Sequence, residues 1–171
     1  MNITFSNTYK SSIPENYGQV DEFLSRSAQP KKENFIWLKE QGVTDVFNFR
    51  LANEKDVIID EKELVESLGM KYHKLASITQ KPNENNIKIF LTNMADIIKN
   101  GGKAHVHCKA GADRTGMYVF LYKMLNNLGK QDENLNEWMK FGHHKNIFPN
   151  LMDWTVNFIR KLKWFLKFYL V

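Results

Sequence analysis

The feature that most constrains this chain is a ten-residue run of small, polar and charged residues between two apolar segments. The run occupies residues 107–116 and reads His-Cys-Lys-Ala-Gly-Ala-Asp-Arg-Thr-Gly. A short apolar segment, residues 104–106, precedes it, and a long one begins at Met117. The short segment predicts a buried strand and the long one a helix. The sequence therefore predicts a strand, a tight loop and a helix, with the loop at the carboxyl end of the strand.

The residue types in this loop indicate a phosphate-binding site that carries its own nucleophile. Cys108 is the only cysteine, and five residues separate it from Arg114. An ordinary thiol is only a few per cent ionised at neutral pH, so a nucleophilic cysteine needs positive charge nearby. The N–H groups of residues 109–114, the N-terminal end of the following helix and the forked Arg114 guanidinium supply that charge. Gly111 lets the backbone turn without a Cβ penalty.

These groups predict attack of a thiolate on phosphorus and hydrolysis of the resulting phosphocysteine by water. We expect the Thr115 hydroxyl to hydrogen-bond the sulfur and stabilise it as a leaving group. A lone cysteine after a valine is more often a small buried hydrophobe, but that alternative leaves the spacing of the other motif residues unexplained. The expected phosphate-binding residues are Lys109, Ala110, Gly111, Ala112, Asp113 and Arg114.

The pattern His-Cys-x-x-Gly-x-x-Arg-Thr-Gly resembles the signature of the cysteine-dependent protein tyrosine and dual-specificity phosphatases, most closely the bacterial-type atypical members. Two upstream segments, residues 25–30 and 47–54, also resemble bacterial relatives. The resemblance implies Cys108 as nucleophile, Arg114 as phosphate ligand and Thr115 as the hydroxyl of the second step. It implies no metal and no other cofactor. Rhodanese-like and arsenate-reducing proteins share the cysteine–arginine spacing, but His107 and the Thr-Gly pair favour the phosphatases.

The resemblance also implies an acid that protonates the leaving group, but this chain has no acidic residue at the position usual in the family. In the family this acid is commonly an aspartate on a loop some tens of residues before the cysteine, but residues 76–82 contain no acid. Asp113 in the loop itself is our preferred candidate, because some members carry an aspartate there. The alternative for Asp113 is a carboxylate that merely caps the helix. Glu84 lies just past the empty loop, and Asp96 in a helical pattern is more consistent with a solvated side chain.

Several alternatives concern the substrate and the supporting residues. Arg50, at a predicted strand end, either supports the site or pairs with Glu54 four residues later. Lys109 suits a substrate with several phosphates, or is a solvated loop lysine. We expect a phosphorylated protein as substrate, with inositol phosphates or phosphoinositides as the alternative. A phosphate-binding module without turnover is a second class of function, but such a module has no need of Cys108.

Alternating helix and strand patterns predict one α/β domain over residues 1–171, with a lead-in over 1–25. Its sheet is mostly parallel and flanked by helices, and its C-terminus is helical. The predicted strands cover residues 43–49, 70–75 and 104–107, and the predicted helices cover 32–41, 60–68, 83–100, 115–127, 133–141 and 151 onward.

Charge and cysteine content limit the partners and the cellular compartment that we expect for this chain. The chain has 24 basic and 19 acidic residues, a net charge of +5 that steers anionic substrates towards it. No nucleic-acid-binding motif accompanies this charge, so we expect no nucleic-acid partner. A single cysteine suits a reducing compartment, and the N-terminus shows no signal peptide, so we expect a cytoplasmic protein. His143 and His144 are adjacent and lack the spacing of metal ligands.

The C-terminal segment, residues 151–171, predicts an amphipathic helix. From residue 154 on, most of its apolar residues share one broad face, with Arg160 and Lys167 opposite and Lys161 and Lys163 flanking it. Trp164 and Phe168 fall among the polar positions. A helix of this kind packs on a core, contacts an anionic membrane from its surface, or forms a dimer face. Its four basic residues speak against a membrane-spanning helix.

Overall fold

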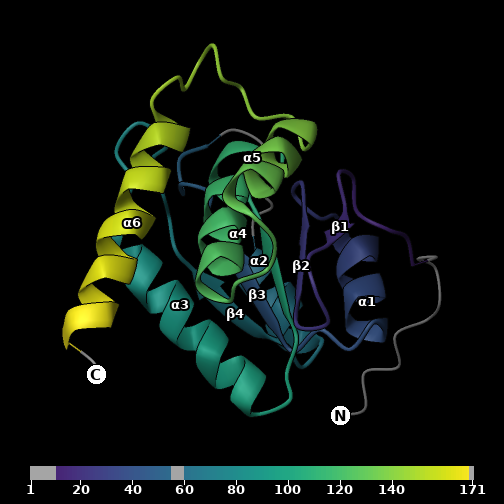
Figure 1. The fold of residues 1–171 in the computed structure, drawn as a ribbon. Coiled ribbons are helices and arrows are strands. Elements are labelled where there is room, and N and C mark those ends of the chain that lie inside the picture. Colours follow the sequence, from purple (N-terminus) through teal and green to yellow (C-terminus); the bar gives the residue numbers. More distant parts are fainter. Residues whose placement is uncertain (1–10, 55–59, 170–171) are drawn as a thin grey trace, which may run out of the picture.

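A five-stranded sheet lies at the centre of the fold, with helices on both of its faces (Figure 1). The computed structural model describes residues 11–54 and 60–169. The strand order is β1-β2-β5-β3-β4, in which β1 is antiparallel to β2 and all other neighbours are parallel. The carboxyl ends of four strands therefore meet at one edge of the sheet. The strands are β1 (Gly18–Gln19), β2 (Leu24–Ser27), β3 (Asp45–Asn48), β4 (Lys71–Lys74) and β5 (Ala104–His107).

The helices form one layer on each face of the sheet. Helices α1 and α2 cover one face, and the other helices gather on the opposite face (Figure 1). The helices are α1 (Lys32–Glu40), α2 (Glu61–Ser67), α3 (Glu84–Lys99), α4 (Asp113–Leu125), α5 (Gln131–Lys140) and α6 (Leu151–Tyr169). None of these described helices is long and apolar enough to cross a membrane.

Strand β5 is buried on both faces, and its side chains alternate between two environments. Val106 packs into the core shared with α3, α4 and α6. His105 points to the other face, where its ring nitrogens lie 2.9 Å from the Ser25 hydroxyl and 2.8 Å from the Ser27 hydroxyl. His107 lies on the same face and packs edge-on against Phe35 of α1. The polar residues of the strand are therefore buried with partners rather than left unsatisfied.

Helix α4 is the central helix of its layer. Nine of its thirteen residues are buried, which accounts for the long apolar run that begins at Met117. Helices α5 and α6 both pack against α4. Because α4 follows β5 directly, its N-terminus lies at the carboxyl edge of the sheet.

The predicted fold class, a mostly parallel α/β sheet with flanking helices and a helical C-terminus, is confirmed. Three predicted strands and six predicted helices are present, with ends shifted by at most two residues. The helix predicted over 115–127 begins earlier, at Asp113. Strands β1 and β2 were not predicted, because Leu24–Ser27 contains one apolar residue and three polar ones, all of them buried.

Candidate active site

The loop between β5 and α4, residues 108–112, forms the bottom of the candidate site at the carboxyl edge of the sheet. Gly111 has a backbone φ of +70°, a conformation that disfavours other residues. A Cβ atom at this position would also lie 2.5 Å from the carbonyl carbon of Ser27. The chain can therefore turn this tightly against β2 only with glycine at position 111.

Four consecutive carbonyl groups of the loop are held from outside. They belong to residues 109–112 and accept hydrogen bonds from the Gln29 N–H (3.0 Å), Asn16 Nδ2 (2.9 Å), Arg26 Nη2 (2.7 Å) and Trp138 Nε1 (3.0 Å), in that order. In a trans peptide the carbonyl and the following N–H point in opposite directions. The N–H groups of residues 110–113 therefore face the inner side of the loop, as an anion-binding nest requires.

Two of these donors are fully buried side chains that the sequence did not identify as site residues. Arg26 is covered by the Phe141 ring, 3.8 Å from its guanidinium carbon, and burial lowers the pKa of Arg26 to about 10. Trp138 of α5 packs on Gly116, where a Cβ atom would lie 2.0 Å from the indole nitrogen. The glycine that ends the motif thus makes room for the indole that holds Ala112. In the sequence, only the glycine at position 116 indicated that a large side chain packs against the start of this helix.

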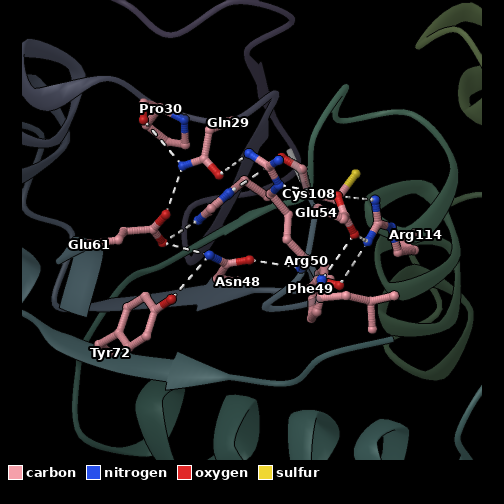
Figure 2. Close-up of polar contacts among 12 residues, drawn as sticks. Gln29, Pro30, Asn48, Phe49, Arg50, Glu54, Glu61, Tyr72, Cys108 and Arg114 are labelled. Atoms are coloured by element: carbon pink, nitrogen blue, oxygen red, sulfur yellow. Dashed lines mark hydrogen bonds and ion pairs between the residues drawn. The ribbon is translucent and has the colours of Figure 1, made fainter. Parts of the chain in front are cut away.

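The guanidinium of Arg114 is oriented by Glu54 (Figure 2). Both of its terminal nitrogens bond the Glu54 carboxylate, and one also donates to the Phe49 carbonyl oxygen at 3.2 Å. Burial raises the pKa of Glu54, but the hydrogen bond from Arg114 and its further partners outweigh burial and lower that pKa to about 2. Glu54 is therefore ionised at neutral pH and holds the arginine side chain in one plane.

Arg50 lies beside this pair and is almost completely buried. Its Nε donates to Glu54 at 3.2 Å, and its Nη1 donates to Gln29 at 3.0 Å (Figure 2). The ion pair with Glu54, one of the two alternatives from the sequence, is present. One carboxylate thus links Arg50 to Arg114.

Cys108 is only 2% exposed and lies between positive groups. Arg26 and Arg114 both interact favourably with a negative charge on its sulfur. The hydroxyl of Thr115 is buried and has no hydrogen-bond partner among the described residues. The Thr115 hydroxyl is therefore available to a further group.

His107 is buried and bonded to a carboxylate on the far side from the loop. Its Nε2 lies 3.0 Å from Glu61 of α2. Glu61 also accepts hydrogen bonds from Gln29 at 2.7 Å and from Asn48 at 2.9 Å (Figure 2). Burial raises the pKa of Glu61, but His107 and these donors outweigh burial and lower it. The network fixes the ring of His107 next to the nucleophile.

Asp113 is bound by both histidines of the connection between α5 and α6. Its carboxylate accepts hydrogen bonds from His143 Nδ1 (2.7 Å), His144 Nδ1 (2.8 Å) and the His144 backbone N–H (2.9 Å). Burial raises the pKa of Asp113, but the bonds from His143 and His144 outweigh it and lower the pKa. The structure thus joins the two histidines, which the sequence excluded only as metal ligands, to the aspartate in the loop.

The remaining predicted residues lie at different places. Lys109 is exposed at the rim of the loop. Glu84 is in the first turn of α3 and lines a hollow beside α6, and no hydrogen bond or ion pair of the described residues joins it to the phosphate loop. Asp96 is exposed on α3. Within residues 11–54 and 60–169, no three histidine, cysteine or acidic side chains gather as a metal-ligand set.

Comparisons with known proteins agree with this geometry. The model of a family described as "Polymorphic toxin system, DSP-PTPase phosphatase" matches residues 23–126. Among solved structures, a DUF442 protein of Shewanella putrefaciens is similar at 24% identity, with a TM-score of 0.73 over 86% of this chain and 90% of that one. Structures of P. aeruginosa TpbA in complex with phosphotyrosine and of the S. cerevisiae PP-IP phosphatase SIW14 share 17% identity each. Their TM-scores are 0.70, over 93% of this chain and 98% of that one, and 0.65, over 88% and 87%.

No curated protein is a significant match to the chain in sequence. The family match nevertheless covers more than half of the chain and includes the whole phosphate loop. The likeness to the solved structures shows the same fold. The chain therefore belongs to the DSP-PTPase phosphatase family of polymorphic toxin systems and is a cysteine-dependent phosphatase.

Proposed function

We propose that this phosphatase hydrolyses phosphotyrosyl proteins, with dual specificity as an extension, through a phosphocysteine intermediate. The observation that carries the proposal is the phosphate loop itself, whose outward-held carbonyls turn four N–H groups to the inner side of the loop that joins Cys108 to Arg114. The Cys108 sulfur forms a bond to phosphorus while the bond to the leaving oxygen breaks. Water then attacks phosphorus, the sulfur–phosphorus bond breaks, and phosphate and the thiolate are released.

Thr115 is proposed to assist the second step. Its buried hydroxyl, without a partner among the described residues, follows directly after Arg114. A hydrogen bond from this hydroxyl to the departing sulfur stabilises the thiolate as it forms. Lys109 to Arg114 are proposed to bind the phosphate, with His107 and Arg50 as supporting residues.

Asp113 is proposed to deliver the proton to the leaving oxygen, with His144 as the group that replaces that proton. The lowered pKa of Asp113 means that its carboxylate is mostly ionised at neutral pH, so it must gain a proton before it can donate one. His144 Nδ1 lies 2.8 Å from this carboxylate, and its side chain is 46% exposed to solvent. The pair therefore offers a route for a proton from solvent to the leaving group.

An inositol phosphate is the second candidate substrate. Lys109 is exposed at the rim of the loop, and Lys74 at the end of β4 interacts electrostatically with Glu61, Arg50, Glu54 and Arg114. Two cations near the phosphate loop suit a substrate with more than one phosphate. SIW14, a structural neighbour, is a PP-IP phosphatase. The need to keep the Cys108 thiol reduced supports action in the cytoplasm.

A substrate panel tests the proposal. The full chain is incubated with a phosphotyrosyl peptide, a phosphoseryl peptide and an inositol polyphosphate, and released phosphate is measured. We expect the phosphotyrosyl peptide to be hydrolysed fastest and Cys108→Ser to be inactive on all three. Faster hydrolysis of the inositol polyphosphate would instead identify inositol phosphates as the preferred substrates. A wild-type chain that binds phosphate without releasing it from any substrate would make the protein a binding module.

A further inference from the structure

Helix α6 changes its surroundings halfway along its length. In the first half, Leu151, Thr155, Phe158 and Ile159 are buried, and the helix packs against α4. From residue 160 on, all side chains that the structure describes are half-buried or exposed. The described side chains of the helix that are fully buried therefore all lie in its first half, and in the second half Leu162 still packs against the core from a partly buried position.

Two large aromatic side chains are exposed on the second half of α6. Trp164 is 59% exposed and Phe165 is 50% exposed. Trp164 follows the buried Thr155 by nine residues, which at 100° per residue places it on the opposite side of the helix. Exposed aromatic residues that adjoin one another are typical of a surface that contacts a partner.

Positive charges surround these aromatic residues. Arg160, Lys161 and Lys167 lie one turn from Trp164 along the helix, and Lys163 is its neighbour in sequence. We name residues 160–167 the outer half of α6. Beside it lies a hollow of about 670 Å³ between α6 and the start of α3, whose charged lining residues are Glu84, Lys88, Arg160 and Lys161. Three of these four charged groups are cations, so the surface combines apolar area with net positive charge.

We propose that the outer half of α6 and the adjoining hollow bind the surface of an anionic lipid bilayer. Tryptophan and phenylalanine insert at the level of the headgroups, and lysine and arginine pair with lipid phosphates. A second copy of the chain is a poor occupant, because two such faces would bring like charges together. The mode of binding is peripheral, since no described helix can cross a membrane.

The position of this surface determines how the bound protein is oriented. Helix α6 starts near the edge of the sheet that carries the phosphate loop and runs towards the opposite end of the molecule (Figure 1). Trp164 lies about 20 Å along the helix from Leu151, at a rise of about 1.5 Å per residue. A bilayer at the outer half of α6 therefore leaves the phosphate loop facing the solution. The surface serves as an anchor, and the substrate reaches the site from the aqueous side.

Vesicle co-sedimentation tests this proposal with the full chain. The vesicles consist of phosphatidylcholine alone or with phosphatidylserine. We expect binding only to the vesicles with phosphatidylserine, and weaker binding as salt increases. The double variant Arg160→Gln/Lys161→Gln should bind about 25-fold more weakly, at about fivefold per cation. The matched control Lys32→Gln/Lys62→Gln removes the same charge from exposed positions of α1 and α2 and should bind like wild type.

The aromatic contribution has its own variant. Trp164→Ala should weaken binding by about tenfold or more while it leaves hydrolysis of a soluble aryl phosphate unchanged, which shows that the variant is folded. Equal binding to both kinds of vesicle, or equal losses in the lysine control, would overturn the proposal. So would a wild-type dimer that Trp164→Ala converts to a monomer, because the face would then join two copies. None of these outcomes depends on which phosphorylated substrate the enzyme prefers.

Discussion

At the scale of single residues, the site depends on carboxylates that hold arginine and histidine side chains in place. Glu54 connects Arg50 and Arg114, Glu61 fixes His107, and Asp113 binds the two histidines after α5. Each of these carboxylates has a lowered pKa because its hydrogen-bond donors outweigh its burial. The ionised form of each group is therefore part of the folded structure.

The Glu54 interaction predicts a pH-dependent stability. Its pKa falls from 4.5 to about 2 on folding, so its contribution is present above pH 4.5 and is lost as the pH falls towards 2. Because Glu54 is partly exposed, we expect Glu54→Gln to lower the free energy of unfolding by only about 1 kcal/mol at pH 7. In denaturant unfolding from pH 7 to pH 3, the difference in unfolding free energy between Glu54→Gln and wild type should narrow below pH 4.5. Glu40→Gln, at the exposed end of α1, should show no such difference. Because the folded pKa of about 2 leaves part of the contribution in place at pH 3, the contradicting result is a difference at pH 3 as large as that at pH 7.

The proposed proton donor predicts a dependence on the leaving group. Asp113→Asn should lower kcat for an alkyl phosphate by about 100-fold or more. For an aryl phosphate with an acidic phenol we expect a loss of roughly tenfold or less, since that leaving group needs little protonation. His144→Gln should show the same selectivity to a smaller degree.

The exposed Asp96→Asn is the matched control and should leave both rates unchanged. The measurement is steady-state kinetics with both substrates as a function of pH. An equal loss with alkyl and aryl phosphates would assign Asp113 to a structural role only.

At the scale of elements, the sequence predicted the unit that carries the chemistry but not the elements that hold it. The strand, loop and helix around Cys108 follow from local apolar patterns and one glycine, so they were predictable. Strand β2 was not, because its polar residues are buried through contacts with a strand some 80 residues away. The contribution of Trp138 and of the histidines after α5 was missed for the same reason. Their partners are distant in sequence, and no local pattern encodes them.

The contact between α4 and α5 gives an element-scale prediction. Gly116→Ala places a methyl group where the Trp138 indole lies, so we expect a loss of about 1–3 kcal/mol in unfolding free energy. Trp138→Phe keeps only a six-membered ring and removes the N–H donor to the Ala112 carbonyl, so we expect kcat to fall in addition to the free energy of unfolding. Trp164→Phe makes the same substitution at an exposed position and should change neither. Unaltered kcat in Trp138→Phe would mean that this hydrogen bond does not shape the loop.

At the scale of the whole molecule, the site is assembled from four separate stretches of the chain. Residues 16–29 and 49–54 hold the loop and its arginine from the sheet side, residues 107–115 form the loop, and residues 138–144 close it from α5. The motif alone identifies the reaction, whereas the shape of the loop requires all four stretches. The opposite end of the molecule, with the outer half of α6, takes no part in this assembly.

The hydrogen bonds from Trp138 and His143 to the phosphate loop also bear on how the enzyme is made. Both residues leave the ribosome after the complete Cys108–Gly116 motif has been synthesised. A nascent chain that ends before α5 has its nucleophile and its arginine, but it lacks the Trp138 donor to the Ala112 carbonyl and the His143 donor to the Asp113 carboxylate. We therefore expect translation to separate the appearance of the reactive cysteine from the onset of catalysis, and unfinished chains to be poor phosphatases.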